Sequence, residues 1–244
     1  MQIFIQINIC INHFINSNEI YKVLQGMKNI AVYLLMCIYM TTDMSAQSSK
    51  SFLALGDSYT IGESVPIFES FPYQTLRMLR EAGVKINAPE IIAKTGWTTD
   101  ELLLGIENSV LLKKYDYVTL LIGVNNQYRG RNITEFKDQF KILLKKAIAY
   151  SGGKLKNVVV LSIPDWGVSP FAQGRDRNKI ATEIDAFNLL IKQISSEAGV
   201  RFLNITNGTR EATNDPSLLA HDKLHPSGKE YKRWADRLSK MFLE

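Results

Sequence analysis

The chain has little cysteine and little histidine. Its two cysteines, Cys10 and Cys37, both lie before the first strand-like segment, which starts near Ser51. The rest of the chain therefore has no thiol nucleophile and no cysteine metal site. Of the three histidines, His13 lies in the N-terminal region, which leaves His221 and His225 for chemistry in the remainder.

Blocks of like charge are also missing. The 29 lysines and arginines and 24 aspartates and glutamates give a net charge of +5, and the basic residues are dispersed along the chain. Surfaces that bind nucleic acid cluster their basic residues and interleave them with aromatic ones. We therefore expect no nucleic-acid partner, and we interpret the charge as a solvated basic surface.

A long apolar segment is absent as well. The apolar run from Ile30 to Met40 is too short for a comfortable membrane span. It follows the positively charged start at Met27 and precedes small residues ending at Ala46, which is the layout of a secretory signal. We predict an N-terminal extension with signal peptide over residues 1–47, the signal at about 27–46.

Three expectations follow from this layout. Translation is expected to begin at Met27, and the less favoured alternative is that residues 1–26 are a genuine extension. Cleavage is expected near Ala46 and leaves no integral membrane span. The mature protein is then secreted or periplasmic.

From Ser51 onward, strand-like and helix-like segments alternate, which indicates one α/β domain over residues 48–244. The predicted strands are Ser51 to Leu55, Val84 to Ile92, Tyr117 to Ile122, Asn157 to Ile163 and Val200 to Ile205. Apolar residues recur at helical spacing over residues 136–148, 180–194 and 231–241. Right-handed crossovers between such strands predict a three-layer α/β/α fold with a five-stranded parallel sheet.

Ligands of this architecture bind beyond the carboxyl ends of the strands. Ser58, Gly96, Asn125 and Pro164 each follow a predicted strand closely. A serine hydroxyl becomes a nucleophile when a base takes its proton, and histidine is the usual base near neutral pH.

His225 is the favoured base, because Asp222 lies three residues before it and could hold the imidazole in the correct tautomer. His221 competes for the same role but has no acid three residues before it. In a purely structural alternative, both histidines are ordinary surface residues.

The oxyanion formed during acyl transfer needs hydrogen-bond donors already in place. The backbone N–H of Ser58 can supply one donor. Gly96 lets the backbone approach closely, and the side-chain amide of Asn125 offers an N–H. Taken singly, Gly96 could be a turn residue and Asn125 a helix cap.

Taken together, these residues resemble four sequence blocks of the GDSL, or SGNH, hydrolase family. Residues 56–59 look like its first block, Gly96 matches the second-block glycine, residues 123–126 are similar to the third block, and residues 222–226 match the last. The blocks occur in the family's order, and the resemblance runs from about Ser51 to the C-terminus. Two positions depart from the family pattern: Asn126 replaces the usual aspartate, and Lys94 replaces the usual asparagine.

The resemblance implies a flavodoxin-like SGNH hydrolase fold and a serine esterase that needs no metal or organic cofactor. It assigns Ser58 as nucleophile, His225 as base and Asp222 as acid, with the oxyanion hole formed by Ser58, Gly96 and Asn125. An acyl-serine intermediate then forms on Ser58 and is hydrolysed. Residues within or beside the blocks and on the strand-end loops are expected to contact the substrate: Asp57, Tyr59, Trp97, Asn126, Tyr128, Arg129 and Trp166.

The expected partner is a small-molecule or glycan ester. Small acyl esters are favoured because no long apolar lid is evident, and acetylated glycans and lysophospholipids are also consistent with the family. Two alternatives stay open: an O-acyltransferase that uses the same triad on saccharides, and a non-catalytic glycan-binding module. A protease is disfavoured because nothing suggests an extended peptide groove, and the oligomeric state is not indicated.

Overall fold

The structure is a computed structural model that describes residues 19–33 and 48–244. The chain divides into two units, residues 1–47 and residues 48–244. In the first unit, residues 19–33 form a helix, and most of the predicted signal segment, with the cleavage position at Ala46, lies outside the described residues. Within those residues, no helix is both long enough and apolar enough to cross a membrane.

In the second unit, five parallel strands form one sheet in the order β2-β1-β3-β4-β5. This order confirms the predicted flavodoxin-like α/β fold. The strands are β1 (Phe52–Asp57), β2 (Glu90–Lys94), β3 (Tyr117–Leu121), β4 (Val158–Leu161) and β5 (Arg201–Leu203).

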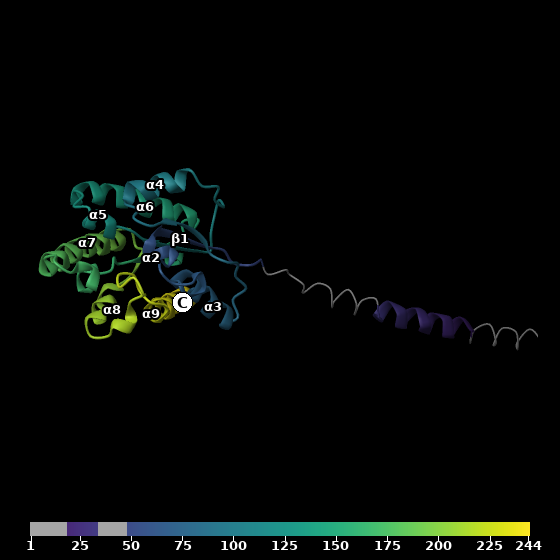
Figure 1. The fold of residues 1–244 in the computed structure, drawn as a ribbon. Coiled ribbons are helices and arrows are strands. Elements are labelled where there is room, and N and C mark those ends of the chain that lie inside the picture. Colours follow the sequence, from purple (N-terminus) through teal and green to yellow (C-terminus); the bar gives the residue numbers. More distant parts are fainter. Residues whose placement is uncertain (1–18, 34–47) are drawn as a thin grey trace, which may run out of the picture. The chain divides into compact units, whose positions relative to one another are not determined.

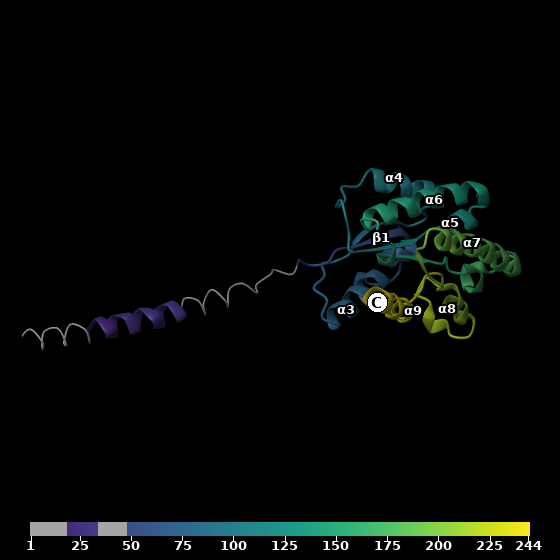
Figure 2. The ribbon, with the colours of Figure 1, turned by 180° about the vertical axis from the view of Figure 1, so that it is seen from behind.

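Helices cover both faces of the sheet. Figure 1 shows α4, α6 and α7 on one face and α3 and α9 on the other, and the view from behind shows the same division (Figure 2). The α-helices after β1 are α2 (Ser58–Ile61), α3 (Phe71–Glu81), α4 (Thr99–Glu107), α5 (Val124–Tyr128), α6 (Ile133–Tyr150), α7 (Arg177–Glu197), α8 (Thr206–Arg210) and α9 (Gly228–Leu243). Short 3-10 helices are η1 (Ile67–Glu69), η2 (Leu155–Asn157), η3 (Trp166–Val168), η4 (Pro170–Ala172), η5 (Glu211–Thr213) and η6 (Pro216–Leu218).

The hydrophobic core lies between these layers. Every residue of β1 and β4 is buried, as expected for parallel strands covered on both faces. The apolar faces predicted for the three longest helices are confirmed, since Phe140 of α6, Ile184 of α7 and Trp234 of α9 are almost fully buried. Fully burying such a side chain stabilises the folded state by about 1.5–3 kcal/mol. Alternating apolar strands and helices therefore pack against each other as the layers of the fold.

The second strand begins later than the sequence indicates. It was expected over Val84 to Ile92, but β2 runs from Glu90 to Lys94. The N–H of Val84 still bonds the carbonyl of Leu79 at the end of α3, and Pro89 has no N–H to donate. Continuous pairing with β1 therefore starts only after Pro89.

The register of the sheet brings the loops after β1, β2 and β3 together at the carboxyl ends of these strands. Asp57 pairs with Lys94 of β2, and Gly56 pairs with Leu121 of β3. The residues that follow these strands must therefore lie next to each other at the point where the strand order reverses. Ligands bind at this point in doubly wound sheets.

Candidate active site

Ser58 begins the short helix α2 directly after β1. Asp57 caps this helix, because its side chain accepts a hydrogen bond from the N–H of Tyr59 at 3.0 Å. Gly56 is required by a close approach: a Cβ added there would lie 2.0 Å from Oγ1 of Thr60 and 2.4 Å from the carbonyl oxygen of Leu121. This tight turn places the Ser58 hydroxyl at the carboxyl end of β1.

A chain of hydrogen bonds joins Ser58, His225 and Asp222. Nε2 of His225 lies 3.0 Å from Oγ of Ser58, and Nδ1 lies 2.6 Å from Oδ2 of Asp222. An ionised carboxylate only accepts hydrogen bonds, so Nδ1 of the imidazole donates to Asp222. Nε2 of the neutral ring is then left to accept the proton of the Ser58 hydroxyl.

Asp222 is held by donors from two segments of the chain. The N–H groups of Leu224 and His225 bond Oδ1, both at 3.0 Å, and the hydroxyl of Ser64 bonds Oδ2 at 2.7 Å. Partial burial acts to raise the pKa of Asp222, but the hydrogen bonds outweigh it and lower the pKa from 3.8 to about 2. Asp222 is therefore a carboxylate at neutral pH.

Gly96 and Asn125 lie beside Ser58 on the loops after β2 and β3. Gly96 has φ of +83°, a left-handed conformation that favours glycine. The amide of Asn125 donates to the carbonyl oxygen of Trp97 at 3.1 Å, with Oδ2 of Asp57 at 3.5 Å. These contacts hold the side chain of Asn125 in place beside Ser58.

A cavity of about 170 Å³ opens above Ser58, and most of its lining is apolar. Its lining residues are Ser58, Tyr59, Thr95, Gly96, Val124, Asn125, Tyr128, Trp166, Phe171, Leu224 and His225. The structure thus brings together the predicted nucleophile, base and oxyanion residues in one cavity, with Asp222 behind the imidazole.

Three of the predicted substrate contacts lie on this cavity. Tyr59 packs against the imidazole, with 4.9 Å between the ring centroids of Tyr59 and His225. Tyr128 and Trp166 pack edge to face, with ring centroids 5.2 Å apart, and Phe171 contacts both. Trp166 is fixed because its indole N–H donates to Oε1 of Gln127 at 2.7 Å.

The prediction of substrate contact is wrong for Asp57 and Asn126, which are buried away from the cavity. Asp57 is 0% exposed and lies beneath Ser58. Asn126 is 2% exposed and uses its amide on Thr99 at the start of α4, accepting from the N–H at 3.1 Å and donating to the hydroxyl at 2.8 Å. An aspartate there could not donate, so this pairing gives a physical reason for the departure from the family pattern.

Trp97 and Arg129 likewise do not line the cavity. The ring of Trp97 covers Gly105 of α4, where an added Cβ would lie 2.2 Å from it. The guanidinium of Arg129 bonds the carbonyl oxygen of Gly96 at 2.5 Å and pairs with Glu101 at 3.4 Å. Arg129 therefore contacts the loop that contains Gly96, and Trp97 packs on α4 beside that loop. Substrate contact by these two residues stays a prediction.

The structure also reveals residues that the sequence did not indicate. Thr95, Val124 and Leu224 line the cavity, and Ser64 contacts Asp222. Thr95 precedes Gly96, and Val124 and Leu224 lie within the third and last blocks, so their place in the sequence could have suggested them. Ser64 has no such signal. His221, the competing base, is exposed, and the imidazole that contacts Ser58 belongs to His225.

Metal ligation finds no support in residues 19–33 and 48–244. No group of three or more His, Cys, Asp or Glu side chains is arranged there to hold a metal ion.

Comparison with known proteins gives consistent similarities. Residues 54–233 match the model of the GDSL-like Lipase/Acylhydrolase family. An acetylxylan esterase from Geobacillus stearothermophilus is 24% identical over 142 residues, which span 54% of this chain and 62% of that relative, less than two thirds of its length.

Solved structures share the fold. A lipase/acylhydrolase from Enterococcus faecalis is similar with a TM-score of 0.59 and 21% identity, over 78% of this chain and 94% of that one. A psychrotrophic esterase, EstA from Pseudoalteromonas sp., is similar with a TM-score of 0.62 and 17% identity, over 80% of this chain and 97% of that one. Both contain the same arrangement of sheet and helices.

Proposed function

The chain belongs to the GDSL-like lipase/acylhydrolase family and is an ester-bond hydrolase, and on that premise we propose that it hydrolyses short-chain carboxylic esters through an acyl-serine intermediate on Ser58. The observation that supports this most directly is the hydrogen-bonded series Ser58–His225–Asp222 at the floor of an apolar cavity. The Enterococcus and Pseudoalteromonas relatives support the fold alone, and the substrate is argued from the cavity.

Acylation begins when Oγ of Ser58 attacks the ester carbonyl carbon. Nε2 of His225 takes the hydroxyl proton, and the carboxylate of Asp222 stabilises the imidazolium that results. The N–H of Ser58, the N–H of Gly96 and the amide of Asn125 donate to the oxyanion. The C–O bond then breaks, and the imidazolium gives its proton to the leaving alcohol.

Deacylation repeats these steps with water as the nucleophile. His225 takes a proton from water, and the resulting hydroxide attacks the acyl carbon on Ser58. Collapse of the second tetrahedral intermediate releases the carboxylic acid and returns the proton to Oγ. Atoms balance as ester plus water giving acid plus alcohol.

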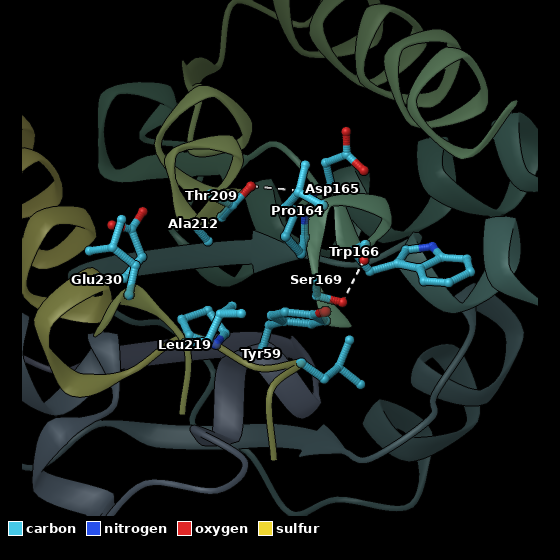
Figure 3. A pocket seen from close by; sticks show the side chains of 13 residues that line it. Tyr59, Pro164, Asp165, Trp166, Ser169, Thr209, Ala212, Leu219 and Glu230 are labelled. Carbon is cyan, nitrogen blue, oxygen red and sulfur yellow. Dashed lines mark hydrogen bonds between the residues drawn. The ribbon is translucent and has the colours of Figure 1, made fainter. Parts of the chain in front are cut away.

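The size of the cavity favours a short acyl group. Tyr59, Trp166 and Leu224 separate the cavity above Ser58 from a smaller space of about 10 Å³ further inside, since all three line both. In Figure 3, Tyr59 and Trp166 lie on one side of this inner space, and Thr209, Ala212 and Glu230 lie on the other. So small a space holds about one water, and a longer acyl chain would have to displace part of this wall.

The mouth of the cavity favours a flat or ring-shaped alcohol group. Tyr128 and Phe171 are 44% and 48% exposed there, and exposed aromatic faces suit the apolar faces of sugar rings. An acetylated glycan therefore fits both ends of the site, and the similarity to an acetylxylan esterase supports this class. Lysophospholipids fit less well because their acyl chains are long.

The test is ester hydrolysis by a Ser58→Ala enzyme. Without the attacking oxygen, hydrolysis of p-nitrophenyl acetate is expected to fall below about 1% of the wild-type rate. Ser109→Ala is the matched control, because the Ser109 hydroxyl bonds the carbonyl of Gly105 at the end of α4. Full activity in Ser58→Ala would contradict the proposal.

Product analysis separates hydrolysis from acyl transfer. With an acyl donor and a saccharide acceptor present, a hydrolase releases free acid, whereas an O-acyltransferase forms acylated sugar. Free acid as the main product is expected here. Labelling of Ser58 by a fluorophosphonate would independently exclude a non-catalytic glycan-binding module.

Export belongs to the same proposal. The layout of residues 27–46 fits a secretory signal, so the active protein would reach the periplasm or the medium. Mass spectrometry of the exported protein is expected to find an N-terminus next to Ala46 and no peptide from before Met27. An intact N-terminus beginning at Met1 would contradict both expectations.

A further inference from the structure

We propose that Ser64 is a positioning residue for the acid of the triad, holding the carboxylate of Asp222 in the orientation that directs the imidazole of His225 at Ser58. The proposal rests on the function proposed above for Ser58. Ser64 lies outside the recognised sequence blocks, and it reaches the reacting atoms only through Asp222.

The Ser64 hydroxyl bonds the oxygen that matters for His225. Oδ2 of Asp222 accepts from Oγ of Ser64 at 2.7 Å and from Nδ1 of His225 at 2.6 Å. The other oxygen, Oδ1, is bonded by N–H groups of the same turn. Loss of the Ser64 bond would leave Oδ2 with His225 alone, and only the two N–H bonds to Oδ1 would then resist rotation of the carboxylate about its Cβ–Cγ bond.

This bond also links the two segments that form the site. Ser58 and Ser64 are six residues apart on one segment, and Asp222 and His225 are three apart on another. The bonds Ser58–His225 and Ser64–Asp222 therefore join these segments at two points. Two points of contact fix the relative orientation of the segments, which one bond cannot do.

Backbone strain is concentrated on either side of this bond. Among the residues that the structure describes, the non-glycine residues with positive φ are Ser64, at +66°, and Lys223, at +57°. A left-handed conformation costs a non-glycine residue about 1–2 kcal/mol, and such strain persists at functional sites where surrounding contacts hold it. A glycine at position 64 would avoid this strain but would lack the hydroxyl.

The Ser64 side chain is not what shapes its own loop. Backbone bonds from Glu63 to the Ser58 carbonyl, at 3.0 Å, and from Val65 to the Gly62 carbonyl, at 3.2 Å, fix the turn on both sides. The side-chain bond that the structure shows for Ser64 goes to Asp222. The hydroxyl is therefore available for positioning the acid.

Two variants separate the hydroxyl from the backbone. Ser64→Gly and Ser64→Ala both remove the hydroxyl, but only glycine is comfortable at a φ of +66°. Both are expected to lower kcat by about 10-fold, as for loss of a hydrogen bond to a charged group, with KM unchanged. The free energy of unfolding is expected to stay level or rise in Ser64→Gly and to fall in Ser64→Ala.

The control is Ser70→Ala, which removes a hydroxyl of the same loop that bonds the carbonyl of Ile67 at 2.7 Å. It is expected to keep wild-type kcat. The proposal is overturned if Ser64→Gly keeps wild-type kcat. It is also overturned if the loss of kcat follows the loss of unfolding free energy, so that kcat falls far more in Ser64→Ala than in Ser64→Gly. If instead Ser58→Ala remains active, the proposed function itself fails. Failure of the proposed function and failure of the Ser64 proposal can therefore be distinguished, because they are measured on different variants.

Discussion

At the scale of single residues, Asp57 combines a structural role with an unusual charge state. Its carboxyl is fully buried, and burial raises its pKa from 3.8 to about 7, although the N–H of Tyr59 and the amide of Asn125 favour the charged form. Asp57 caps α2, which begins at Ser58, and its Oδ2 lies 3.5 Å from the amide nitrogen of Asn125.

The first prediction concerns the stability of an Asp57→Asn variant. Between about pH 4 and pH 7 the folded protein keeps a proton that the unfolded chain has lost, so the free energy of unfolding of the wild type falls as pH rises through this window. The slope due to Asp57 is up to about 1.4 kcal/mol per pH unit. Asp57→Asn lacks this slope.

Urea unfolding at several pH values measures the difference between the two proteins. The variant is expected to gain stability relative to the wild type as pH rises from about 4 to about 7. A constant difference across this range would show that Asp57 keeps an ordinary pKa in the folded protein.

The second prediction concerns Asn125. Asn125→Ala removes one oxyanion donor and is expected to lower kcat by about 100-fold, equivalent to about 3 kcal/mol, because the lost bond strengthens in the transition state. Steady-state kinetics on p-nitrophenyl acetate measures this loss, with circular dichroism to check folding. Unchanged kcat would remove Asn125 from the oxyanion hole.

At the scale of elements, the strand ends determine where chemistry occurs. The ends of β1, β2 and β3 place Ser58, Gly96 and Asn125 side by side, while His225 arrives from the turn before α9. The turn after β1 is so tight that only glycine fits at position 56. An element boundary, rather than a long loop, therefore positions the proposed nucleophile.

The third prediction follows from that fit. Gly56→Ala would force a methyl group against Thr60 and the backbone of Leu121. The cost is expected to be about 1–3 kcal/mol or more of unfolding free energy, measured by urea unfolding. A variant that unfolds at the wild-type midpoint would show that β1 and α2 can separate without penalty.

The fourth prediction concerns the wall between the cavity and the inner space. Leu224→Ala would join the cavity and the inner space and so make room for longer acyl chains. Relative kcat/KM is expected to rise about fourfold for each methylene group that becomes buried. Rates on p-nitrophenyl acetate and hexanoate give this ratio. Leu219→Ala is the control, because Leu219 lines the inner space but not the cavity above Ser58. An equal change in the hexanoate-to-acetate ratio of kcat/KM in both variants would contradict the proposal that Leu224 limits the acyl chain length.

Much of this organisation was predictable from the sequence. The strong apolar runs predicted β1, β3 and β4, and the order of the blocks indicated which residues meet. The edge strand β2 was misplaced because its residues are only half-buried, so its pattern is weak. Ser64 was missed because a serine at positive φ leaves no mark in a sequence. Asp57 and Asn126 were expected to contact the substrate because they lie within the blocks, and membership of a block does not reveal burial.

At the scale of the whole molecule, the unit of residues 48–244 contains the complete sheet, both helix layers and the cavity. A unit with its own core is expected to fold independently.

The fifth prediction is that a chain beginning at Ser48 unfolds at the same temperature as the full-length chain and has the same kcat/KM. Calorimetry and steady-state kinetics on both forms make the comparison. A truncated chain that is less stable or less active would show that residues 1–47 contribute to the folded enzyme.

The two-segment origin of the site has a consequence for synthesis. The serine leaves the ribosome first, and its acid and base follow 164 or more positions later. A nascent or prematurely terminated chain therefore has a hydroxyl without a proton acceptor and is inert towards cellular esters. Activity begins only when the segment that contains Asp222 and His225 has emerged and α9 has docked on the sheet.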